Sequence, residues 1–148
     1  MASLNRLAFS ATLHCLTGCA IGEILGLVIA TALGWGNGAS IAVAVVLAFV
    51  FGYSFTLVPL LRGGIAVGIA VGLALASDTL SIAVMEIVDN AIILLWPGAM
   101  DAGLADVLFW GSLAIALAIA FVAAFPVNRA LIARGRGHAV VHASYHDH

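Results

Sequence analysis

The stretch His14-Cys15-Leu16-Thr17-Gly18-Cys19-Ala20-Ile21-Gly22-Glu23 brings a histidine, both cysteines of the chain and a carboxylate together at the start of an apolar run that continues to Leu33. On a helix, Cys15, Cys19 and Glu23 follow one another at intervals of four residues, so they lie along one slowly drifting row. Two thiols and a carboxylate within an apolar helix need an explanation, because burying polar groups without partners is unfavourable. The rest of the chain limits the possible explanations of this polar row.

The composition excludes a soluble domain. The chain has 148 residues, of which 64% are hydrophobic and 8% charged, whereas a soluble domain carries roughly 25% charged residues. We therefore expect one integral membrane domain over residues 1–148, in contact with membrane lipid. The net charge of −2 gives no indication of a nucleic-acid partner, since nucleic-acid binding relies on clustered positive charge.

Four apolar runs predict an all-α fold, an integral membrane four-helix bundle. Glycine-rich turns and the loop Pro97–Asp106 separate the runs. A membrane core of about 30 Å needs roughly 20 apolar residues per helix, and every run reaches that length. The expected helices cover residues 11–33, 39–61, 65–96 and 107–133, followed by a polar tail, 134–148.

The orientation is predicted from the arginines, because the chain has no lysine. With four spans, all five arginines fall on the same side of the membrane, which the positive-inside rule assigns to the cytoplasm. We therefore expect an N-in/C-in, multi-pass protein of the bacterial inner membrane. These arginines are Arg6, Arg62, Arg129, Arg134 and Arg136.

Glycines repeat every four residues in the first and third apolar runs. Such ridges let helix backbones approach closely in membranes, so we expect them to pack helices within the bundle or in a homo-oligomer. The two ridges are Gly18, Gly22 and Gly26 in the first run, and Gly64, Gly68 and Gly72 in the third.

The third run carries polar residues that are unusual at membrane depth. Ionisable residues there face the bundle interior or a water-filled cavity and indicate a functional site, and several carboxylates in a dry interior must share protons, bind a cation or reach water. With Glu23, placed at a depth similar to that of Asp78, they predict a proton or ion path. Interhelical hydrogen bonding between protonated carboxyls is the structural alternative. The residues are Asp78, Glu86, Asp89 and Asn90.

The opening stretch also predicts a metal site. Thiolates and imidazole favour soft or borderline ions, so His14, Cys15 and Cys19 indicate copper first and zinc second, with Glu23 as a further ligand. His14 lies about 100° round the helix from Cys15 and reaches the same ion only if the first turn loosens or a second chain contributes. Met85 adds a thioether, and Glu86 and Asp89 add carboxylates. The alternative is that the cysteines are small apolar packing residues.

The tail repeats histidine at intervals of four residues, beginning with His138 and His142. A helical tail would place these imidazoles on one stripe, and a disordered tail would form a loose chelator. A solvated tail without a binding role is the alternative. Its predicted cytoplasmic side is also that of His14.

Three segments resemble one known family. They are His14-Cys15-x-x-Gly18-Cys19-x-x-Gly22-Glu23, Asp78–Asn90, and Phe125-Pro126-Val127-Asn128 through Gly137-His138. Together they resemble the bacterial membrane family called domain-of-unknown-function family 4396. The resemblance covers nearly the whole chain and implies a four-helix membrane fold without an established activity, and some members look associated with copper proteins.

These observations favour binding or transport of a soft metal ion, with copper or zinc as the bound ion, and without catalysis. One alternative is a proton-coupled small-molecule transporter, in which Glu23 or Asp78 carries the proton. A second is a membrane thiol oxidoreductase, although a second dithiol or a quinone motif is not visible in the sequence, and the usual redox spacing is Cys-x-x-Cys.

Overall fold

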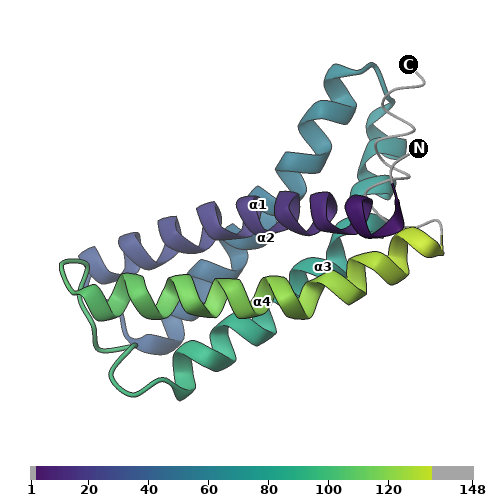
Figure 1. The fold of residues 1–148 in the computed structure, drawn as a ribbon. Coiled ribbons are helices and arrows are strands. Elements are labelled where there is room, and N and C mark those ends of the chain that lie inside the picture. Colours follow the sequence, from purple (N-terminus) through teal and green to yellow (C-terminus); the bar gives the residue numbers. More distant parts are fainter. Residues whose placement is uncertain (1–2, 135–148) are drawn as a thin grey trace.

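The computed structural model describes residues 3–134, which form four α-helices (Figure 1). Each helix is long and apolar enough to cross a membrane, so the chain is an all-α, multi-pass membrane protein. The helices are α1 (Leu4–Ala32), α2 (Asn37–Arg62), α3 (Val67–Leu95) and α4 (Val107–Ala133).

Helix α1 begins seven residues before the expected start at residue 11. Ser3 is its N-cap, and the Ser3 hydroxyl accepts a hydrogen bond of 3.2 Å from the backbone N–H of Arg6. Polar residues in this first part of the helix, such as Asn5 and Arg6, are exposed and do not interrupt it. The helix therefore begins before the apolar run, which covers only its later part.

The other helices lie close to their expected bounds. Helix α2 begins at Asn37, two residues early, because Gly36 takes an extended conformation and serves as the N-cap. Helix α3 is shorter than expected at both ends, and α4 has the expected bounds. Within residues 3–134, the three connections are therefore short turns and the Pro97–Asp106 loop.

Helices α1 and α2 pack backbone to backbone along the first glycine ridge. A Cβ on Gly26 would lie 2.6 Å from Ala44 Cα, and one on Gly22 would collide with the backbone of Leu47. The ridge of α3 behaves differently, since a Cβ on Gly68 or Gly72 would meet no atom of the described chain within 4 Å. Only the first ridge therefore holds two helices of this chain together.

One end of α2 and of α3 stands apart from the bundle. The two ends meet at residues 63–66, where Gly64 has a φ of +88°, and in Figure 1 they extend away from α1 and α4. A small apolar cluster of Leu60, Ile65 and Ala70 stabilises this hairpin tip. The main buried cluster lies nearer the middle of the same helices, around Ala48 of α2 and Ile82 and Met85 of α3.

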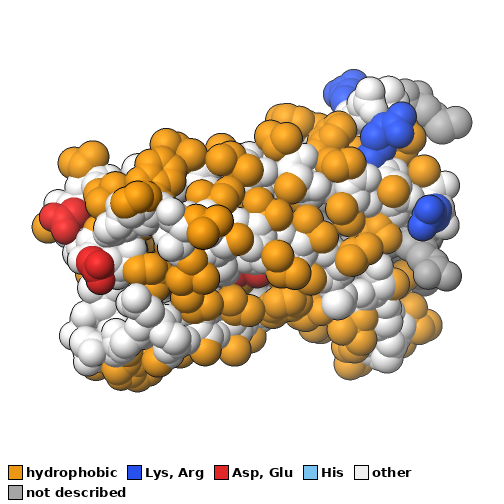
Figure 2. Space-filling model, turned by 90° about the horizontal axis from the view of Figure 1, so that it is seen from below, with side chains coloured by type: hydrophobic (Ala, Val, Ile, Leu, Met, Phe, Trp, Pro, Cys, Tyr) orange, Lys and Arg blue, Asp and Glu red, His pale blue; other side chains and the backbone are white. Residues whose placement is uncertain are grey.

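The two ends of the bundle carry opposite charges. Figure 2 shows basic side chains at one end, acidic side chains at the other and an apolar surface between them. The start of α1 and the end of α4 share the basic end, where Arg129 Nε donates a hydrogen bond of 2.7 Å to Asn5 Oδ1. We call this the arginine end, and the opposite end, with the Pro97–Asp106 segment, the loop end.

Candidate functional site

Polar side chains are buried along the interior faces of α1 and α3, over much of the length of both helices. Helix α4 contributes mainly small residues to the same interior, the buried Ala116, Ala120 and Ala124. The interior is therefore lined by polar side chains from α1 and α3 and mainly by small side chains from α4. The buried polar and sulfur-bearing residues of α1 and α3 are Thr12, Cys15, Cys19, Glu23, Ser77, Asp78, Ser81, Met85, Glu86 and Asp89.

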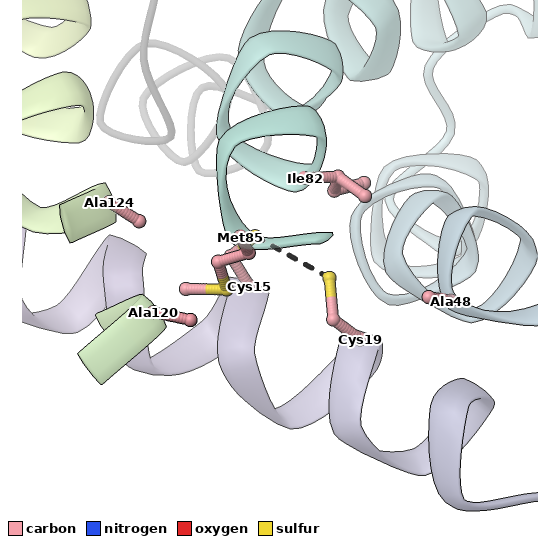
Figure 3. Packing of buried hydrophobic residues seen from close by; sticks show 7 residues of the cluster. All are labelled: Cys15, Cys19, Ala48, Ile82, Met85, Ala120 and Ala124. Carbon is pink, nitrogen blue, oxygen red and sulfur yellow. Dashed lines mark hydrogen bonds between the residues drawn. The ribbon is translucent and has the colours of Figure 1, made fainter. Parts of the chain in front are cut away.

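Three sulfur-bearing side chains meet near the middle of this interior (Figure 3). Cys15 and Cys19 are free thiols on successive turns of α1, and their Sγ atoms lie 3.8 Å apart. Met85 of α3 belongs to the same buried cluster and is 1% exposed. Ser81 Oγ donates a hydrogen bond of 3.2 Å to Cys15 Sγ. We call Cys15, Cys19 and Met85 the sulfur cluster.

The spacing of the two thiols is suited to sharing one ion. Two thiolates bound to a tetrahedral zinc ion at about 2.3 Å lie roughly 3.8 Å apart, and the Sγ atoms of Cys15 and Cys19 are 3.8 Å apart. A disulfide instead needs about 2.05 Å. The Ser81 hydroxyl also orients the Cys15 sulfur by donating to it.

The structure does not bring His14 to the sulfur cluster. The His14 ring lies beside the Phe55 ring, with centroids 5.9 Å apart, in an open pocket that Ser10, Leu13 and Thr17 also line. The cysteines face the interior instead, because neighbouring residues on a regular helix are rotated by about 100°. His14 is therefore a poor ligand candidate within one chain.

A carboxylate pair lies one turn beyond Cys19 toward the loop end. Glu23 of α1 and Asp89 of α3 interact across the helix interface, and each is 1% exposed. Apart from the Glu23–Asp89 interaction itself, Glu23 Oε2 and both carboxylate oxygens of Asp89 meet no hydrogen-bond donor among residues 3–134. Buried oxygens of this kind need protons or a cation.

Glu86 stands between the carboxylate pair and the sulfur cluster, since it interacts electrostatically with both Glu23 and Cys19. Asn90 holds it in place: Asn90 Nδ2 donates to Glu86 Oε2 at 3.3 Å and to the Glu86 backbone carbonyl at 2.8 Å. Sulfur and carboxylate groups therefore form one continuous buried set.

The partner of Glu23 differs from the sequence-based expectation. We expected Glu23 to share its depth with Asp78, but Glu23 interacts with Asp89. Because α1 begins at Leu4, Glu23 lies farther along its helix than the apolar run suggested. Asp78 lies nearer the arginine end, where its Oδ1 accepts a hydrogen bond of 3.1 Å from Ser77 Oγ.

Sequence reasoning missed Ser81 as a partner of the sulfur cluster, and Thr12 and Asn128 altogether. Asn128 Nδ2 donates to Thr12 Oγ1 at 3.1 Å and ties α4 to α1. The available signal was a polar residue on the buried stripe of each apolar run, since Thr12 precedes Cys15 by nearly one turn and Ser81 precedes Met85 by one.

Within residues 3–134, no three side chains of the His, Cys, Asp and Glu types converge as metal ligands. The set that comes closest to the predicted site is therefore two thiols and the thioether of Met85, a donor type outside those four. His138 and His142 lie outside the described residues.

The family of the chain follows from comparison with known proteins. The family model described as domain of unknown function (DUF4396) matches residues 4–137. The chain belongs to this family. No functionally curated protein and no solved structure matches the chain. The DUF4396 match spans all four helices, the sulfur cluster and the carboxylates.

Proposed function

We propose that this DUF4396 protein binds a soft metal ion at the sulfur cluster and moves it across the membrane. Copper, as Cu(I), is the first candidate and zinc the second, because thiolate and thioether ligands favour these ions. Cys15, Cys19 and Met85 are the proposed ligands, and Glu23, Glu86 and Asp89 form the proposed proton and cation path. The class is binding and transport, without catalysis.

One observation carries the proposal: the Sγ atoms of Cys15 and Cys19 lie 3.8 Å apart beside a buried methionine. Packing alone explains a single buried cysteine. It does not explain two thiols at ligand spacing, a hydroxyl donor on one of them and carboxylate oxygens without further donors one turn away.

The carboxyl groups give the released protons a way out of the interior. When a metal ion replaces the protons of two thiols, two S–H bonds break, two metal–sulfur bonds form and two protons leave. Glu86 interacts electrostatically with Cys19, and the Glu23–Asp89 pair lies one turn farther. These carboxyl groups can relay the protons along the interior by passing on their own.

The first experiment is elemental analysis of the purified protein. We expect stoichiometric copper or zinc in the wild type and its loss in the Cys15→Ser/Cys19→Ser variant. His14→Ala is the matched control, because His14 lies on the same helix but faces Phe55, and it should keep the metal. Equal metal content in the wild type and the double variant would refute the sulfur site.

A second candidate is a proton-coupled small-molecule transporter. The observation that favours it is the Glu23–Asp89 pair, whose oxygens meet no other donor within the described chain and which needs no sulfur to carry a proton. This candidate predicts that transport survives in Cys15→Ser/Cys19→Ser and fails in Glu23→Gln. A thiol oxidoreductase is less well supported, because Cβ atoms four residues apart on one helix lie about 5–6 Å apart, whereas a disulfide needs about 3.8 Å.

The proposal extends to location and assembly. We place the protein in a bacterial inner membrane with both termini in the cytoplasm, since its arginines gather at one end. We also propose a homo-oligomer, whose mass in lipid nanodiscs can be measured directly. Membrane lipid and the metal ion are its other partners.

A further inference from the structure

A small, partly enclosed cavity lies at the loop end of the bundle. Its volume is about 40 Å³, which is room for about three waters when one water needs roughly 10–15 Å³. All four helices and the Pro97–Asp106 segment contribute to its wall. The residues used below are Leu27 and Thr31 of α1, Ser40 of α2, Ile93 of α3, and Phe109 and Ser112 of α4.

The cavity is placed directly beyond the carboxylate pair. Leu27 follows Glu23 by four residues on α1, and Ile93 follows Asp89 by four residues on α3, a rise of about 6 Å in each helix. One apolar layer, Leu27 and Ile93, therefore separates the cavity from the buried carboxylates. Thr31 is one further turn out, where α1 is exposed.

Two buried hydroxyls line the cavity, and each already donates a hydrogen bond to a backbone carbonyl. Ser40 Oγ donates to the Gly36 carbonyl at 2.9 Å, and Ser112 Oγ donates to the Leu108 carbonyl at 2.6 Å. Each oxygen keeps its lone pairs for a group inside the cavity. These oxygen acceptors, contributed by α2 and α4, are suited to water in the cavity, which can donate to both walls.

From this placement, we propose that the cavity is the hydrated vestibule through which cations reach Glu23 and Asp89 from the loop end, with the Leu27–Ile93 layer as the closed gate. The inference rests on the proposed function, because it names the access route to the same site. It adds the side from which the carboxylates are reached and the residues that close that route.

The test uses Ag⁺ as a small, thiol-reactive probe of water-filled space. Ser112→Cys is made in the Cys15→Ser/Cys19→Ser background, and the full chain is placed in lipid nanodiscs so that both ends meet water and lipid covers the sides. Ile115→Cys is the matched control, since Ile115 lies on the same helix and is 46% exposed on the bundle surface. The amount of Ag⁺-protected thiol is read by alkylation after denaturation.

We expect Ser112→Cys to react at least ten times faster than Ile115→Cys. Ser40→Cys probes the same cavity from α2 and should behave like Ser112→Cys, which guards against a folding defect in either variant. Equal rates for the cavity and lipid-facing cysteines would overturn the vestibule. Because this readout is made without the native thiols, it is independent of metal binding: fast labelling supports the vestibule even if the wild type binds no metal.

Discussion

Glu23 of α1 and Asp89 of α3 interact across the bundle interior, each 1% exposed. Apart from this interaction, both oxygens of Asp89 lack a hydrogen-bond donor within residues 3–134. An amide at this position keeps the shape of the side chain and removes its charge and its capacity to carry a proton.

Asp89→Asn should therefore abolish function while the fold survives. We expect cation flux into proteoliposomes to fall at least tenfold, and the free energy of unfolding to change by less than about 1 kcal/mol, since the isosteric amide can still donate a hydrogen bond to the Glu23 carboxyl. Asp101→Asn, on the exposed loop, is the control and should carry normal flux. Normal flux in Asp89→Asn would make the carboxylate pair a structural feature.

Ser81→Ala tests the hydrogen bond to the sulfur cluster. The hydroxyl of Ser81 lies 3.2 Å from Cys15 Sγ, and donors to a ligand atom typically contribute about 10–100-fold to metal affinity. We expect Ser81→Ala to weaken Cu(I) affinity about tenfold in a competition titration. Ser54→Ala, where the hydroxyl donates to a carbonyl of its own helix at an exposed site, should bind like the wild type. Equal Cu(I) affinity of the two variants would show that the Ser81 hydrogen bond to Cys15 does not strengthen metal binding.

Gly22→Ala tests the close contact between α1 and α2. A Cβ there collides with the backbone of Leu47, which cannot move aside as a flexible side chain could, so we expect a loss of about 1–3 kcal/mol in the free energy of unfolding. Gly68→Ala is the matched control, because a Cβ at that position meets nothing within 4 Å. Equal stability of both variants in thermal unfolding would show that the two helices do not depend on this contact.

Reporter fusions test the orientation of the chain in the membrane. A reporter after His148 should be active as a cytoplasmic fusion, and one inserted in the Pro97–Asp106 loop should be active as a periplasmic fusion, because the arginines gather at the opposite end from that loop. The reversed pattern would place the vestibule on the cytoplasmic side and overturn the N-in/C-in assignment.

The fold was predictable because hydrophobicity alone specifies it. Apolar runs of sufficient length can only be helices in a membrane, since every backbone group must be bonded within its own segment. Helix starts were less predictable: Ser3 caps α1, but the polar residues after it concealed the start. The family assignment was confirmed by the match over residues 4–137.

The burial of the carboxylates could be predicted residue by residue, but their contacts with one another could not. Burial of Glu23, Asp78, Glu86 and Asp89 follows from the unfavourable exposure of carboxylates to lipid. Which of them meet depends on the relative shift of α1 and α3, and periodicity carries no information about that shift. For the same reason, the glycines at 18, 22 and 26 pack on α2 while those at 68 and 72 do not, although both ridges have the same spacing.

We propose that Cys15, Cys19 and Met85 bind one soft metal ion. The most direct measurement is a Cu(I) titration of the detergent-solubilised protein against a competing chelator, with Met85→Leu and Cys15→Ser/Cys19→Ser beside the wild type. We predict stoichiometric binding by the wild type, weaker binding by Met85→Leu, none by the double variant, and weaker binding as pH falls, because protons compete for the thiolates. Equal binding by the wild type and the double variant would contradict the account and leave the cysteines as packing residues.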